Sequence, residues 1–320
     1  IETPLRKGNW FGKRWKTLAV GGGVLITLSS GLFALIKPLR GQLYTGNRSQ
    51  ITTLETWWRD KDGNHKDKCH VKSFKIKLMK ECLGSTAQKS APFGYLIGDS
   101  YARNYLIAAR KALPSFDIKY MTMGYGCAFL PSSMISDELD KSVSCNQYSK
   151  SVASLIVKES RPGDIVFIGQ ALYGKNHDIR ATPTYFDHIK VLAQKLKDKK
   201  IPIIIFDGTF PPRQTPMLCM KEFFRPFPKK FDCEKTIDEA RSSYNRFDKL
   251  AVSLSNSSEN IYYAPLRLGL CVKETCGQFT KKGTPIWHDD GHITEQASGE
   301  LADMLRQHLT QTNIRISDKK

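Results

Sequence analysis

Five short apolar runs, separated by segments of helical periodicity, constrain the fold of this chain more than any other feature. The runs span residues 93–97, 116–121, 164–168, 201–206 and 260–264. Such alternation is typical of βαβ units, whose strands are parallel and whose helices cover both faces of the sheet. We therefore predict a three-layer αβα sandwich with a mostly parallel, five-stranded sheet over residues 91–320. Its ligands should bind at the carboxyl ends of the strands.

Helical patterns fill the intervals between these runs. One begins directly after Ser100 and stops before Pro114, and another carries an apolar stripe up to Ile156. Further helices are expected over residues 185–196, within 234–254, and over 295–309, the last with Thr294 as its N-cap.

A stretch without charged residues, Thr17–Ile36, is long enough to cross a bilayer as a helix. A cleaved signal peptide is the alternative, but the run is longer than a usual signal core and no small-x-small cleavage site follows. Five basic residues precede the stretch and only two follow it closely, which predicts a cytoplasmic N-terminal end. We expect a membrane segment within residues 1–40 (helix about 17–36), a lysine-rich extension or linker over 41–90, and an exported domain.

Eight cysteines fall into four spaced couples, a pattern typical of disulfides in an oxidising compartment. We predict nearest-neighbour pairing: Cys69 with Cys82, Cys127 with Cys145, Cys219 with Cys233, and Cys271 with Cys276. His65, Cys69 and His70 lack regular zinc-ligand spacing, so no metal is expected. The formal net charge of +18 suits a position near anionic lipid or polysaccharide, and no aromatic-interleaved basic motif indicates a nucleic-acid partner.

The first candidate for chemistry is Ser100, which follows Gly98 and Asp99 at the end of the first apolar run. A serine at a strand's carboxyl end exposes its hydroxyl near helix N-terminal amides that can stabilise an oxyanion. A purely structural interpretation is that Ser100 caps the helix over residues 101–112.

A second candidate group stands almost two hundred residues later. A serine nucleophile needs an imidazole to take its proton and a carboxylate to orient that imidazole. Asp289 and His292 are three residues apart in a turn before the last helix, so we predict the catalytic set Ser100, His292 and Asp289. Asp290 is a second choice for the acid, and His288 is a rival base.

The segments Gly98-Asp99-Ser100 and Asp289-Asp290-Gly291-His292 resemble the first and last sequence blocks of the SGNH (GDSL-like) hydrolases. The resemblance implies that Gly126, with Gly124 as the alternate, is the second-block glycine, which donates to the oxyanion together with the Ser100 amide.

The third block departs from the family pattern, because Gly169-Gln170-Ala171-Leu172-Tyr173 contains no Gly-x-Asn-Asp. Gln170 or Asn176 is the candidate for the missing donor.

The first residues, Ile1-Glu2-Thr3-Pro4-Leu5-Arg6, resemble an (I/V)-E-x-P-x-R element near the end of the integral-membrane acyltransferase-3 domain. In bacterial carbohydrate O-acyltransferases that domain is often fused to an SGNH domain. The resemblance implies O-acetyl transfer to a surface glycan, such as lipopolysaccharide O-antigen, by a periplasmic domain on the inner membrane. Acetyl-CoA would be the ultimate donor through the membrane domain, with no cofactor in this domain.

Two other functions remain open at this stage. A membrane-tethered carbohydrate acetylesterase would use the same three catalytic residues. A non-catalytic glycan-binding module on an SGNH scaffold is the third possibility, suggested by the departure at the third block.

Overall fold

The computed structural model describes residues 12, 14–39, 68–84, 91–124, 127, 129, 139–172, 181–210, 212–213, 219, 233–288, 291–312 and 314. The chain divides into two compact units. The described part of the smaller unit is the helix α2, and the larger unit is an α/β domain.

Helix α2 (Arg14–Leu39) runs without interruption through Gly21-Gly22-Gly23. Its segment Trp15–Leu35 has a mean hydropathy of 1.9 and none of it is buried within the structure. This confirms one apolar helix, long enough to cross a membrane, at the place where the sequence predicts it.

The α/β domain is built on a parallel sheet in the order β1-β3-β2-β4-β5-β7. The strands are β1 (His70–Val71), β2 (Phe93–Asp99), β3 (Asp117–Met123), β4 (Ile165–Gly169), β5 (Ile203–Phe206) and β7 (Ile261–Ala264). A separate antiparallel pair joins β6 (Lys235–Thr236) to β8 (Thr275–Cys276). The predicted parallel α/β fold is therefore confirmed.

The sheet has six strands in place of the predicted five. The additional strand, β1, aligns His70 with Thr122 of β3. A two-residue strand is too short to produce an apolar run, so sequence patterns miss it. The segment interpreted as a linker over 41–90 thus contributes to the sheet, and its helix α4 (Ile76–Leu83) buries Leu83 in the domain core.

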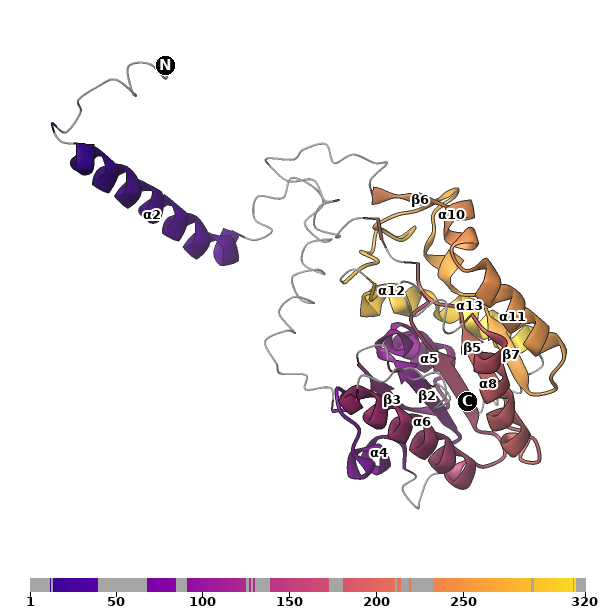
Figure 1. Ribbon diagram of the computed structural model, residues 1–320. Helices are drawn as coiled ribbons and strands as arrows, with labels where there is room; N and C mark the ends of the chain where they lie inside the picture. The colour runs from indigo at the N-terminus through magenta and orange to yellow at the C-terminus, as the bar shows by residue number, and fades with distance from the viewer. Residues whose placement is uncertain are drawn as a thin grey trace. The chain divides into compact units, whose positions relative to one another are not determined.

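Helices cover the sheet in two layers (Figure 1). Helices α4, α6 (Leu139–Glu159), α8 (Pro183–Leu196) and α11 (Asn245–Asn256) lie side by side in this order. The other layer consists of η2 (Ser100–Tyr105), α5 (Leu106–Ala112), α12 (Glu295–Glu300) and α13 (Ala302–Gln311). Right-handed crossovers place α5 and α6 on opposite faces, because the chain reverses direction across the sheet after β3. The two short remaining helices are α10 (Ile237–Ser242) and η5 (Arg267–Leu270).

The interior strands β4 and β5 are buried along their whole length. Their apolar sequences, Ile-Val-Phe-Ile-Gly and Ile-Ile-Ile-Phe, are typical of strands covered on both faces. Phe167 of β4 and Phe206 of β5 stack with ring centroids 5.4 Å apart. This core holds the carboxyl ends of neighbouring strands in register.

The structure contains all four nearest-neighbour disulfides: Cys69–Cys82, Cys127–Cys145, Cys219–Cys233 and Cys271–Cys276. The first ties the residue before β1 to α4. The second joins the segment after β3 to α6. Both bonds therefore anchor chain segments near the carboxyl ends of the strands.

Candidate active site

Ser100 lies at the point where the sheet's connections change direction. From β2 the chain passes to β3 on one side, and from β3 it crosses to β4 on the other. The carboxyl end of β2 therefore faces the crevice in which parallel α/β sheets bind ligands. Ser100 is the first residue of η2, directly after this strand end.

Two glycines let η2 lie close against the ends of β2 and β4. Gly98 has φ of +139°, and a Cβ atom there would lie 1.8 Å from the carbonyl oxygen of Gly169. A Cβ atom on Gly169 would lie 2.6 Å from the Cα atom of Ala102. A side chain at Gly98 would push β2 away from β4, and one at Gly169 would push η2 away from β4, so these glycines determine where Ser100 stands.

The cap of η2 is Asp99 and not Ser100, which corrects the structural alternative considered for the serine. The buried Asp99 carboxylate accepts hydrogen bonds from the backbone N–H of Tyr101 at 2.9 Å and of Ala171 at 2.9 Å. Within the described residues, the Ser100 hydroxyl makes no hydrogen bond. The Ser100 hydroxyl therefore does not cap the helix.

His292 is carried by a loop between two paired strand segments. Trp287 and Ile293 form an antiparallel bridge, and the His288 N–H donates to the carbonyl oxygen of His292 at 2.8 Å. Trp287 is fully buried, and its indole N–H donates to the carbonyl oxygen of Gly277 at 3.1 Å. Just after the loop, the Thr294 side chain caps α12 as predicted.

The His292 ring also contacts the helix that begins at Ser100. It stacks on the Tyr101 ring with centroids 4.4 Å apart and an interplanar angle of 21°. This contact joins the two sequence segments that were predicted to meet.

Asn104, a buried residue of η2, holds both neighbours of His292. Its side-chain carbonyl accepts from the N–H of Ile293 at 3.2 Å, and its amide group donates to the carbonyl oxygen of Gly291 at 3.4 Å. The amide group also donates to the Thr209 hydroxyl at 3.1 Å, which itself donates to Gly291 at 3.1 Å. Neither Asn104 nor Thr209 stands in a recognisable motif, so neither is among the site residues predicted from the sequence.

Ser100 and His292 line one pocket of about 180 Å³. The residues that line it come from β1, from the η2–α5 helix pair, and from the loop and helix around His292: His70, Ser100, Arg103, Asn104, Leu106, Ile107, His288, His292, Ile293, Thr294, Glu295 and Ser298. The rival base His288 lies in the same lining. Ser100 and His292 are not hydrogen-bonded to each other; catalytic hydrogen bonds in enzymes often form only once substrate is bound.

The other predicted site residues have different outcomes. Asp289, Asp290, Gly126 and Asn176 lie outside the described residues. Gly124, the alternate second-block glycine, donates its N–H to the carbonyl oxygen of Val71 at 2.8 Å. This bond exists because β1, a strand that the sequence pattern does not predict, pairs with the end of β3.

Gln170 follows β4 and is buried, but it does not line the described part of the pocket. Neither polar atom of its side-chain amide has a hydrogen-bond partner among the described residues. A buried amide without a partner is costly and rare, so it is expected to serve a further contact.

His70 enters the pocket from β1, with its Nδ1 atom 2.9 Å from the Thr122 hydroxyl. Within the described residues, no group of three histidine, cysteine, aspartate or glutamate side chains could hold a metal ion. His65 lies outside these residues.

A buried ionic network fixes the end of β5, from which Thr209 reaches the His292 loop. The Asp207 carboxylate accepts from the backbone N–H groups of Leu266 at 2.8 Å and Arg267 at 2.9 Å. The Arg267 guanidinium lies 3.5 Å from Asp207 and also pairs with Asp248. Burial raises the pKa of Asp207 to about 6, although Arg267 and the backbone bonds act in the opposite direction.

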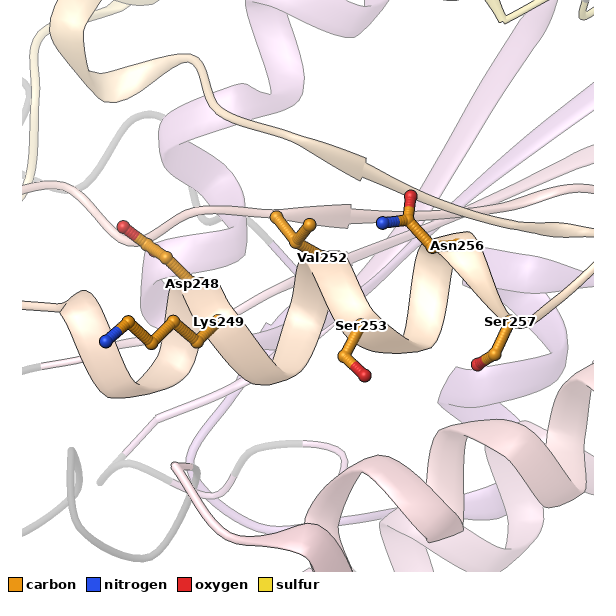
Figure 2. A pocket seen from close by; sticks show the side chains of 6 residues that line it. All are labelled: Asp248, Lys249, Val252, Ser253, Asn256 and Ser257. Carbon is orange, nitrogen blue, oxygen red and sulfur yellow. The ribbon is translucent and has the colours of Figure 1, made fainter.

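A larger hollow of about 580 Å³ lies along α11 and shares no lining residue with the pocket around Ser100 (Figure 2). Its lining comes from that helix and its C-terminal end: Asp248, Lys249, Val252, Ser253, Asn256 and Ser257. It contains none of the predicted site residues.

The fold is a parallel α/β sandwich with a serine at the switch point of the sheet. A histidine from the loop before α12 lines the same pocket as this serine. Together these features define a protein of the SGNH-hydrolase type. The sequence profile of the "SGNH domain (fused to AT3 domains)" matches residues 68–307. The chain therefore belongs to this family.

Solved structures include a similar fold in the periplasmic domain of a lipopolysaccharide acetyltransferase from Salmonella ser. Paratyphi A. It has a TM-score of 0.58 and 18% identity, and the match covers 84% of this chain and 100% of that one. A putative acylhydrolase from Bacteroides fragilis has a TM-score of 0.39 and 12% identity, and the match covers 75% of this chain and 95% of that one. The catalytic domain of peptidoglycan O-acetyltransferase A from Streptococcus pneumoniae has a TM-score of 0.33 and 14% identity, and the match covers 70% of this chain and 95% of that one. A search among curated proteins finds no significant match.

Proposed function

We propose that this domain transfers an O-acetyl group to a hydroxyl of a bacterial surface carbohydrate, such as lipopolysaccharide O-antigen, with Ser100 as nucleophile. The observation that carries the proposal is that Ser100 and His292 line one pocket at the switch point of the sheet. Membership of a family fused to AT3 domains supports acyl transfer, as does the likeness to the Salmonella periplasmic domain.

In the first half-reaction, the Ser100 hydroxyl attacks the acetyl carbonyl carbon while His292 takes its proton. Asp289 is the proposed acid that orients the imidazole. The tetrahedral intermediate collapses, the bond to the donor breaks, and His292 returns the proton to the leaving group. The product is an acetyl ester on Ser100.

The developing oxyanion needs donors beside Ser100. The backbone N–H groups of Ser100 and Gly126 are the proposed donors, and removing one such donor typically costs about 3 kcal/mol. Gln170 is the proposed third donor, with Asn176 as the alternative. Its buried amide, which lacks a partner among the described residues, is consistent with this role, although it would have to turn toward the pocket.

In the second half-reaction, His292 deprotonates a sugar hydroxyl, which attacks the acetyl ester. The Ser100–acetyl bond breaks, the proton returns to Ser100, and the glycan leaves as its O-acetyl ester. Acetyl-CoA is the proposed ultimate donor, through the membrane acyltransferase domain whose end we place in residues 1–40. The domain itself is proposed to use no cofactor and to lie in the periplasm, with α2 as its anchor and the N-terminal end cytoplasmic.

The test is replacement of Ser100 by alanine in the full-length protein. A strain lacking the gene is complemented with the wild type or with Ser100→Ala, and the O-acetyl content of its surface polysaccharide is measured by mass spectrometry. We expect restoration by the wild type only. Unchanged acetylation with Ser100→Ala would instead favour the glycan-binding module, and loss of acetyl groups on complementation with the wild type would favour the carbohydrate acetylesterase.

A further inference from the structure

Two grooves flank helix α6 on the face of the sheet opposite α5. The groove between α6 and α8 has a volume of about 400 Å³, and the groove between α4 and α6 has a volume of about 670 Å³. Lys150, Ser154 and Lys158 line both grooves. These residues are four apart along α6 and therefore share one helix face, which joins the two grooves into one surface.

This surface carries a net positive charge, because its lysines outnumber the one acidic residue of the described lining, Glu159 in the α4–α6 groove. Lys150 and Lys158 project from α6, Lys195 from α8 and Lys80 from α4, and all four are exposed. None of them forms an ion pair within the described part of the chain. Acidic side chains are absent from the described lining of the α6–α8 groove, so nothing there neutralises its lysines.

Apolar side chains lie between these lysines. Val191 of α8 lines the α6–α8 groove with 49% of its surface exposed, and Ile76 of α4 lines the other groove with 58% exposed. Val157 and Leu192 add apolar surface to the α6–α8 groove. Lysines around exposed aliphatic groups suit a membrane interface, because their methylene stems lie along apolar surface while their ammonium groups reach phosphates.

We propose that this surface docks on anionic phospholipid headgroups of a bilayer. We call it the lysine face and define it by Ile76, Lys80, Lys150, Lys158, Val191 and Lys195. The inference rests on the proposed anchoring by α2, which keeps the domain near a membrane. A soluble anionic polysaccharide would use the same lysines, but it would leave Ile76 and Val191 exposed to water.

Docking in this way leaves the candidate active site accessible. The pocket is lined by β1, η2, α5, α12 and the loop before α12, and it shares no residue with the two grooves. The lysine face would thus orient the domain on the bilayer without covering Ser100.

The experiment is lysine footprinting of the full-length protein in nanodiscs, with N-hydroxysuccinimidyl acetate as the reagent and mass spectrometry as the readout. Labelling is compared in nanodiscs of phosphatidylcholine alone and of equal parts phosphatidylcholine and phosphatidylglycerol. We expect the four lysines of the lysine face to react at least about threefold more slowly with phosphatidylglycerol, since each lysine gains about fivefold in affinity near an anionic surface. These are Lys80, Lys150, Lys158 and Lys195. The exposed Lys249 and Lys281, which lie outside the lysine face, should not change.

A charge-reversed variant, Lys150→Glu with Lys158→Glu and Lys195→Glu, should abolish the slower labelling of Lys80. A matched variant, Lys249→Glu with Lys281→Glu and Lys282→Glu, should retain it, and thermal unfolding verifies that both variants fold. Equal slowing at all lysines would overturn the proposal, as would slowing at none. A further arm adds soluble polygalacturonate to the phosphatidylcholine nanodiscs. If polygalacturonate slows the labelling of these lysines and phosphatidylglycerol does not, the lysine face binds a glycan and the proposal is overturned. Ser100→Ala should dock normally, so this test is independent of the proposed chemistry.

Discussion

Replacing Asn104 by alanine tests whether a side chain outside the catalytic set positions His292. The change removes the only side-chain acceptor described for the N–H of Ile293, and two donated hydrogen bonds, to Gly291 and Thr209. The Gly291 carbonyl keeps the bond from Thr209. One buried N–H without a partner costs about 1–3 kcal/mol, and the space left by the amide adds to this cost.

We therefore expect Asn104→Ala to lower the free energy of unfolding by roughly 2–4 kcal/mol. Urea unfolding followed by tryptophan fluorescence measures this, because the buried Trp287 lies beside the His288–His292 loop. Turnover of p-nitrophenyl acetate should also fall at a temperature where the variant is fully folded, since the imidazole loses its orientation.

Thr209→Val is the matched control, because it removes the two hydrogen bonds of the hydroxyl, to Gly291 and from Asn104, but leaves the bond between Asn104 and Ile293. Its expected cost is about 1 kcal/mol, with a smaller effect on turnover. Full turnover by a folded Asn104→Ala variant would refute the positioning role, and unchanged stability would refute the hydrogen-bond reasoning.

Two further predictions concern histidines. His292→Ala should reduce p-nitrophenyl acetate turnover by about 1000-fold or more, whereas His288→Ala should retain most of it; the reverse result would make His288 the base. Burial lowers the pKa of His308 and, together with Lys195, that of His188, so the folded protein keeps both rings neutral where the unfolded chain binds protons. Their contribution to stability is present above about pH 6.5 and is lost as the pH falls through the lowered pKa values. Urea unfolding between neutral and mildly acidic pH should show a shallower loss for His308→Gln than for the wild type, and equal slopes would contradict the assignment.

The fold was largely predictable because the spacing of apolar residues along the sequence indicates which faces of each helix and strand are buried. Strands covered on both faces produce continuous apolar runs, as β4 and β5 do, and Thr294 has the residue type that caps helices. The disulfide pairs were also predictable, since each closes a short loop. The strand number was wrong because β1 is two residues long and gains its pairing from β3 alone.

The candidate site was predictable only in part. The motif around Ser100 and the one around His292 each identify chemistry by residue type and spacing, and the shared pocket is consistent with that interpretation. Asp289 and Gly126 stay predictions. Three roles could not be predicted, because they depend on partners far away in the sequence. These are the cap formed by Asp99, the position of His70 in the pocket, and the hydrogen bonds of Asn104 to the His292 loop.

The amino-acid sequence alone determined the apolar helix, the parallel α/β architecture and the identity of the candidate nucleophile and base. These depend on local periodicity and on the intrinsic chemistry of side chains. Only the tertiary structure decided that Ser100 and His292 line one pocket, that β1 takes up the Gly124 amide, and that the lysines of three helices form one face. Such contacts join residues that are distant along the chain, and their geometry follows from packing across the whole sheet.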